Sequence, residues 1–195
     1  GAATRLTAHP GMEVFPRFSP DGKWIAFTGQ YDGDEQVYVM PAEGGVPTKL
    51  TYYPSEGPLP PRWGYDNIVY GWTPDGKSIL FRSLRDGESA RTETALYTVA
   101  VKGGLPVRLP MHTAGAGDYS PDGKRIVYER VSQWDLEWRN YRGGQNQPVQ
   151  IFTAADASVE KLPWEGSKDM WPVWLGDAIF FISDRDWAGN IWRYD

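Results

Sequence analysis

Residues 18–27 read Phe18-Ser19-Pro20-Asp21-Gly22-Lys23-Trp24-Ile25-Ala26-Phe27, which is an aromatic residue, a Ser-Pro-Asp-Gly-Lys segment and an apolar run. In a reverse turn, proline presets φ, aspartate can hydrogen-bond its own backbone, and glycine accepts a positive φ. The flanking aromatic and β-branched residues suit a pleated surface. The stretch therefore predicts a β-hairpin.

The hairpin pattern recurs along the chain. Residues 72–81 and 119–128 repeat the Pro-Asp-Gly-Lys turn, and residues 174–181 hold a weaker copy with a glycine in the turn. A shorter pattern with Lys or Arg before Leu occurs at residues 4–7, 48–51, 107–110 and 160–163. We interpret this shorter pattern as the outer strand of each repeat. A period of about 40–50 residues with four strands per repeat is typical of a β-propeller.

We predict an all-β propeller of four four-stranded blades in one domain, residues 1–195. The predicted blades span residues 12–51, 68–109, 115–162 and 170–195, and residues 4–7 supply the missing outer strand of the last blade. Pairing Thr4–Thr7 with the last strand would join the chain ends and cover an open edge. The alternative is that two chains form one eight-bladed ring, each completing the other's blade.

Repeated aromatic residues are predicted to pack between the blades. One repeat position holds Phe18, Trp72, Tyr119 and Trp174, and a second holds Phe27, Phe81, Tyr128 and Phe181. Large aromatic side chains fill the wedge between neighbouring blades of such a fold.

Composition excludes several classes of function. The net charge is −5 and no basic run is present, which argues against a nucleic-acid surface. No apolar stretch approaches the ~20 residues of a membrane span, and the residues given predict no signal peptide. The chain has no cysteine, which excludes disulfides and thiolate chemistry. A chain without cysteine fits a cytosolic protein or an exported one, and we favour a periplasmic or secreted location.

Neither catalysis nor metal binding is predicted. The two histidines, His9 and His112, both follow an outer-strand leucine by three residues, so a repeated structural position explains them better than a catalytic base does. The acidic segments Asp32–Glu35 and Asp184–Asn190 lack the spacing of a calcium loop, and we interpret them as turns. We therefore expect no cofactor and no metal.

Two long insertions interrupt the repeats, at residues 52–67 and 131–147. The second is the best functional candidate, because it does not repeat and because binding sites concentrate in long loops on a rigid scaffold. Arginine can hold a carboxylate with two hydrogen bonds, and Trp and Tyr give contact area at low entropic cost. Its candidate residues for binding a peptide or docking a domain are Trp134, Trp138, Arg139, Tyr141 and Arg142. The alternative is that this loop packs over its own propeller or against a neighbouring domain.

The repeated hairpin resembles the WD-like propeller repeat of the Tol-system translocation protein and of tricorn-type peptidases. Residues 9–23, 38–45 and 138–144 are similar to the first propeller of bacterial tricorn-like proteases, and the resemblance covers nearly the whole chain. In that family a second propeller, a PDZ module and a tail-specific serine peptidase domain follow. The resemblance therefore implies a fragment without the catalytic part, from a family whose propellers usually have more than four blades.

Two functions follow as hypotheses. The first is a non-catalytic module that binds, gates or docks peptides for a tricorn-like serine peptidase, with a peptide or the rest of the peptidase as its partner. The second is a structural propeller fragment, natural or engineered, that assembles with itself, for example as a homodimer through shared blades, and has no ligand. No constellation of residues supports an isolated enzyme.

Overall fold

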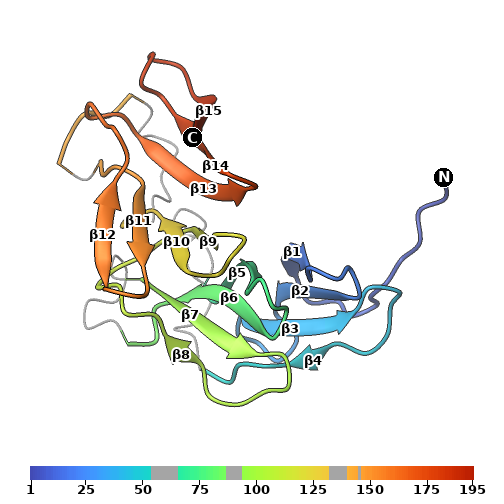
Figure 1. The fold of residues 1–195 in the computed structure, drawn as a ribbon. Helices are drawn as coiled ribbons and strands as arrows, with labels where there is room; N and C mark the ends of the chain where they lie inside the picture. The colour runs from blue at the N-terminus through green and yellow to red at the C-terminus, as the bar shows by residue number, and fades with distance from the viewer. Residues whose placement is uncertain (54–65, 87–93, 132–139, 145) are drawn as a thin grey trace.

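The computed structural model describes residues 1–53, 66–86, 94–131, 140–144 and 146–195. Within these ranges the chain forms fifteen strands in four antiparallel sheets, drawn in Figure 1. Three sheets have four strands and the fourth has three, and in every sheet the strands follow one another in chain order. Each sheet is one blade of a propeller.

The strands are named in chain order. Blade 1 consists of β1 (Glu13–Phe18), β2 (Trp24–Gly29), β3 (Gln36–Pro41) and β4 (Thr48–Lys49). Blade 2 consists of β5 (Ile68–Trp72), β6 (Ser78–Ser83), β7 (Ala95–Ala100) and β8 (Val107–Arg108). Blade 3 consists of β9 (Gly117–Tyr119), β10 (Arg125–Tyr128), β11 (Gln150–Thr153) and β12 (Ser158–Lys161). Blade 4 consists of β13 (Asp169–Leu175), β14 (Ala178–Ser183) and β15 (Asn190–Tyr194).

The Pro-Asp-Gly turns share one hydrogen-bond pattern, which the β9–β10 hairpin illustrates. The Ser120 hydroxyl donates to Asp122 Oδ1 at 2.6 Å and accepts the backbone N–H of Arg125 at 3.0 Å. Asp122 Oδ1 also accepts the backbone N–H of Lys124 at 3.1 Å. Gly123 has φ 71°, a left-handed conformation that glycine adopts without steric cost. The predicted hairpin is therefore confirmed, and its aspartate and glycine have the roles in the turn that the sequence predicted.

The inner strands of three blades carry a β-bulge. The pairing shifts between Val14 and Arg17 in β1, between Val69 and Gly71 in β5, and in β13 between residues 170 and 173. Phe15 and Trp171 occupy the same repeat position within two of these bulges, with φ of 56° and 53°. A bulge re-aims the backbone locally, and in blade 4 it directs the N–H of Trp171 toward blade 3.

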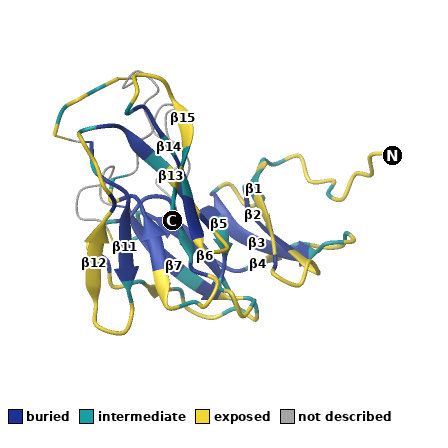
Figure 2. Ribbon diagram, turned by 45° about the horizontal axis from the view of Figure 1, so that its top comes forward, coloured by how far each residue is buried: buried dark blue, intermediate teal, exposed yellow. Residues whose placement is uncertain are grey.

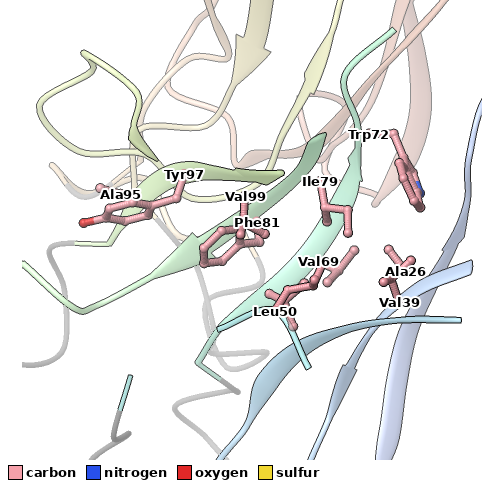
Figure 3. Packing of buried hydrophobic residues seen from close by; sticks show 11 residues of the cluster. Ala26, Val39, Leu50, Val69, Trp72, Ile79, Phe81, Ala95, Tyr97 and Val99 are labelled. Atoms are coloured by element: carbon pink, nitrogen blue, oxygen red, sulfur yellow. The ribbon is translucent and has the colours of Figure 1, made fainter. Parts of the chain in front are cut away.

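Apolar side chains between consecutive blades form the core, and Figure 2 shows the middle strands of blades 1 to 3, such as β2, β3, β6, β7 and β11, as mostly buried. Between blades 1 and 2, Ala26 and Val39 face Val69, Ile79 and Trp72, as Figure 3 shows. The Trp72 indole N–H also donates to the carbonyl of Arg17 at 3.0 Å across this junction. Equivalent clusters join blade 2 to blade 3 and blade 3 to blade 4.

The prediction of an all-β, four-bladed propeller is confirmed. Of the predicted aromatic packing positions, Trp72, Trp174, Phe27, Phe81, Tyr128 and Phe181 are buried and Tyr119 is half-buried. Phe18 is the exception, with 66% of its surface exposed. It lies on the first blade, on the side where the structure places no preceding blade.

The predicted pairing of Thr4–Thr7 with the last strand is not formed, so the propeller is not closed by an N-terminal outer strand. Residues 1–9 contain no strand, and the blade 4 sheet ends at β15. The Thr7 hydroxyl instead donates to Glu13 Oε2 at 2.7 Å, which holds this segment against its own blade. Figure 1 accordingly shows the N-terminus well apart from β15.

Candidate functional site

All longer connections of the propeller leave the blades at one end. Because the strands of each blade alternate in direction, the second strand of a blade ends beside the start of the first and of the third. The Pro-Asp-Gly turns therefore occupy one end of the propeller. The connections from second to third strand, and from one blade to the next, occupy the opposite end, which we call the loop face.

On the loop face, Asp184 organises the connection that follows β14. Its carboxylate is almost fully buried, and Arg142 Nη1 donates to both of its oxygens, each at 3.0 Å. The backbone N–H groups of Lys168 and Asn140 donate to the same carboxylate at 2.8 Å and 3.0 Å. Arg142 Nη2 donates to the Asp184 carbonyl at 2.9 Å. Asp184 thus ties the 140–144 segment to blade 4.

The Arg142 guanidinium also lies over the indole ring of Trp187, 4.4 Å from the ring centroid. Trp187 itself keeps 64% of its surface exposed. A cation over an aromatic face is attracted by the ring quadrupole. Asp184 holds Arg142, and the Arg142 guanidinium packs on the Trp187 ring, so the loop face presents to solvent an aromatic side chain that is supported on one side. We call Arg142, Asp184 and Trp187 the tryptophan platform.

A second arginine of blade 4 has a purely structural environment. Arg185 donates to Asp169 Oδ2 at 3.0 Å and to the Ser183 hydroxyl at 3.0 Å, and its guanidinium lies over the rings of Phe181 and Trp192. Blade 2 repeats this arrangement, where Arg85 contacts Ser83, Asn67, Phe81 and Tyr97 in the same way. This repeated arginine position therefore belongs to the scaffold.

Two buried carboxylates near the loop face accept backbone N–H groups, and one of them, Glu129, connects neighbouring blades. Glu129 at the end of β10 accepts the backbone N–H of Ala116 and that of Trp171 in blade 4, each at 3.1 Å. Burial raises the pKa of Glu129 to about 7, although the two N–H groups, Arg82 and Lys168 act to lower it. Burial likewise raises the pKa of Asp66, which accepts the backbone N–H groups of Asn67 and Leu84.

Of the five residues predicted for the site, Arg142 and Tyr141 lie within the described part of the chain. Trp134, Trp138 and Arg139 lie outside the described residues. The donors of Arg142 that were expected to hold a peptide carboxylate point to Asp184 of the same chain. Tyr141 is half-buried, and its carbonyl accepts Arg142 Nη1 at 3.3 Å.

Sequence reasoning missed Asp184, Trp187 and Glu129. The 184–190 segment was interpreted as an ordinary turn, and the structure does show turn hydrogen bonds there, such as Asn190 Nδ2 to Asp186 Oδ2 at 2.9 Å. The available signal was a tryptophan in a polar turn, where no repeat position calls for an aromatic residue. No sequence pattern indicated that Glu129 would bridge two blades.

His9 and the acidic turns have local structural contacts. His9 Nδ1 accepts the backbone N–H of Gly11 at 2.9 Å, and its ring lies 4.2 Å from that of Tyr31. Asp32 pairs with Lys49 at 2.9 Å. Across the described ranges, no three His, Cys, Asp or Glu side chains are grouped so that they could hold a metal ion. The same ranges contain no helix with the length and apolarity to cross a membrane.

The fold and the loop face define a β-propeller of the kind found as a module in larger proteins. The model of the tricorn protease N-terminal β-propeller domain matches residues 1–195, and the chain belongs to this family. Tricorn protease homolog 1 of Streptomyces coelicolor is 29% identical over 98% of this chain, and the tricorn protease of Thermoplasma acidophilum is 27% identical over all of it. The chain spans 17% and 18% of the length of these two relatives.

Solved structures give the same answer for the fold. A crystal structure of the tricorn protease matches 97% of the chain with a TM-score of 0.76 and 25% identity, and the match covers 18% of that protein. A putative TolB from Agrobacterium tumefaciens matches 85% of the chain with a TM-score of 0.63 and 26% identity, over 52% of its own length. The expected resemblance to tricorn-type and TolB-type propellers is therefore confirmed.

Proposed function

We propose that this propeller is a non-catalytic module of a tricorn-like serine peptidase and that its loop face receives peptides. Family membership supports the first part, since the matched model describes a propeller domain and the relatives named as proteases are about six times longer than the chain. In this proposal peptide cleavage belongs to other parts of such a protein. The propeller guides or holds the peptide.

The tryptophan platform is the observation that carries the peptide-binding part. Trp187 is exposed, yet Arg142 and Asp184 already hold it in place. A preordered aromatic side chain gives contact area with little further loss of conformational entropy. Because Asp184 neutralises Arg142, the platform suits apolar or aromatic peptide side chains better than a terminal carboxylate.

The test is fluorescence anisotropy with labelled peptides that differ in their apolar content. We expect weak binding that increases with aromatic content and that Trp187→Ala weakens about tenfold, which corresponds to about 1.4 kcal/mol. Trp24→Ala is the matched control, because Trp24 is partly exposed at the opposite end of the blade, beside the Pro-Asp-Gly turn. The absence of peptide binding at millimolar concentration, or equal loss in both variants, would overturn the proposal.

The second candidate is a structural module that docks to other protein and has no ligand of its own. The observation that favours it is the internal use of Arg142, whose guanidinium binds Asp184 instead of remaining available to a ligand. In this case Trp187→Ala leaves peptide anisotropy unchanged. The variant would instead weaken association with the remainder of the peptidase, measured by titrating one against the other.

A further inference from the structure

Blade 3 departs from the repeat at one pair of buried residues. In each blade, two side chains of the second and third strands lie opposite each other at the same register. In blades 1, 2 and 4 both members of this pair are aromatic, namely Phe27–Tyr38, Phe81–Tyr97 and Phe181–Trp192. In blade 3 the pair is Tyr128 and Gln150. Gln150 therefore places an amide where the other blades place an aromatic ring.

The Gln150 amide is buried with one of its polar groups unused. Gln150 is 5% exposed, and its Oε1 accepts the Tyr128 hydroxyl at 2.7 Å. This bond occupies the amide oxygen, and the Nε2 group has no acceptor among the residues that the structure describes. Buried donors in proteins are almost always paired, and leaving one unpaired is costly. A ligand that brings an oxygen to Nε2 would remove this cost.

Gln150 lines a pocket of about 250 Å³ at the outer part of the junction between blades 2 and 3. Phe152 and Val159, which are paired on β11 and β12, line one side of it, and residues 110–113 of the connection between the two blades line the other. Met111 anchors that connection in the core cluster of this junction. Figure 2 shows β11 buried and β12 exposed beside it. Both sides of the pocket are thus formed by consecutive blades of this chain, at its solvent-exposed rim.

The lining of the pocket is rich in hydrogen-bond donors. Arg130 and His112 line it together with Gln150, and none of the described residues around it is acidic. Within the described ranges, Arg130 forms no hydrogen bond or ion pair, and His112 is held only through its carbonyl, which accepts Arg108 Nη2 at 2.9 Å. In a chain with a net charge of −5, this pocket presents an unpaired cation.

We propose that this pocket binds a small carboxylate that carries an apolar or aromatic group. The Arg130 guanidinium binds the two carboxylate oxygens, because its fork of N–H groups matches their geometry. Gln150 Nε2 donates a further hydrogen bond, and Phe152 and Met111 pack on the apolar group. Such pockets combine an apolar lining with a few fixed polar groups. The proposal is independent of peptide binding at the tryptophan platform.

Phenylacetate is the probe for this site, and phenylacetamide is its uncharged match. Nitrogen–proton correlation NMR spectra of the chain follow the titration, since the Gln150 side-chain amide reports directly on the pocket. We expect phenylacetate to shift this resonance and phenylacetamide to bind at least about tenfold more weakly. Arg130→Gln should weaken phenylacetate binding about tenfold. Arg193→Gln is the control and leaves binding unchanged, because Arg193 is an exposed arginine of blade 4.

A double variant tests the departure from the repeat itself. Tyr128→Phe combined with Gln150→Tyr restores the Phe–Tyr pair of blades 1 and 2, so we expect it to retain the fold, as checked by circular dichroism, and to lose phenylacetate binding. N-acetylphenylalanine distinguishes two sources of the same chemistry. If it binds more tightly than phenylacetate, the ligand is the end of a peptide, and if it binds more weakly, the ligand is a free acid.

Three results overturn the proposal. The first is that neither acid binds at millimolar concentration. The second is equal affinity for phenylacetate and phenylacetamide, which would mean that the carboxylate is not recognised. The third is unchanged phenylacetate affinity in Arg130→Gln or in the double variant, which would place the binding elsewhere.

Discussion

At the scale of single residues, a buried carboxylate holds backbone N–H groups of two neighbouring blades. Glu129 shows the effect most clearly, because each of its oxygens accepts one backbone N–H and one of these belongs to the next blade. A buried acid favours its neutral form, since the charge is costly in a medium of low polarity. Arg82 and Lys168 offset only part of this cost, and the pKa of Glu129 stays at about 7.

The raised pKa of Glu129 predicts how stability depends on pH. The folded-state pKa lies above the ordinary glutamate value of 4.5, so the stabilising contribution of Glu129 is fully present below about pH 4.5 and is lost as pH rises through 7. The difference corresponds to about 3 kcal/mol at most. Glu129→Gln removes this titration, so its free energy of unfolding should vary less between pH 5 and 8, as measured by urea denaturation.

Glu160→Gln is the control for this comparison, because Glu160 is an exposed residue of β12. Its stability should follow the wild-type pH dependence. If Glu129→Gln did so as well, Glu129 would not be the titrating group. The comparison uses the slope of the free energy of unfolding against pH. Glutamine has one acceptor oxygen fewer than glutamate, and this changes the absolute stability at every pH.

At the scale of elements, the Ser/Thr-Pro-Asp-Gly hairpin determines where each inner strand turns. Gly22, Gly76 and Gly123 have φ of 70°, 67° and 71°, so three blades share one left-handed position. In each turn the aspartate accepts the backbone N–H two residues later, at 3.0–3.1 Å. These contacts span six residues at most, so the sequence alone was sufficient to predict them.

Gly123→Ala should lower the free energy of unfolding by about 1 kcal/mol, because a Cβ at this φ meets the neighbouring carbonyl. Gly189→Ala is the matched control, since Gly189 has no positive φ and no atom lies within 4 Å of its added Cβ. Thermal denaturation of both variants measures the difference. Equal melting temperatures would contradict the role assigned to this glycine.

At the scale of the whole molecule, buried apolar clusters join each blade to the next. Leu80 is fully buried in the cluster that joins blade 2 to blade 3, where it lies with Ile126 and Phe152. Removing such a side chain loses its transfer free energy and leaves a cavity. Leu105 has the same side chain in the turn before β8 but is 90% exposed.

Leu80→Ala should therefore destabilise the protein by about 2–5 kcal/mol, and Leu105→Ala by less than about 0.5 kcal/mol. Chemical denaturation followed by tryptophan fluorescence measures both. A small effect of Leu80→Ala would mean that the junction between blades 2 and 3 contributes little to the cooperative fold.

The sequence by itself determined the repeat, the hairpins and the number of blades. Turn chemistry and strand alternation act over about ten residues, and the spacing of the turns shows how many times the unit occurs. It also determined the aromatic layer between blades, because each blade presents the same residues at the same register. The family resemblance was likewise visible in these local motifs.

Only the tertiary structure decided which residues from distant parts of the sequence contact one another. Arg142 was available in the sequence for a ligand, but the fold places Asp184 beside it and sets its guanidinium over the ring of the exposed Trp187. Thr4–Thr7 matches the outer-strand pattern, yet the blades separate it from β15. The physical reason is that such contacts depend on the accumulated twist and spacing of four packed sheets, which no local preference of the chain specifies.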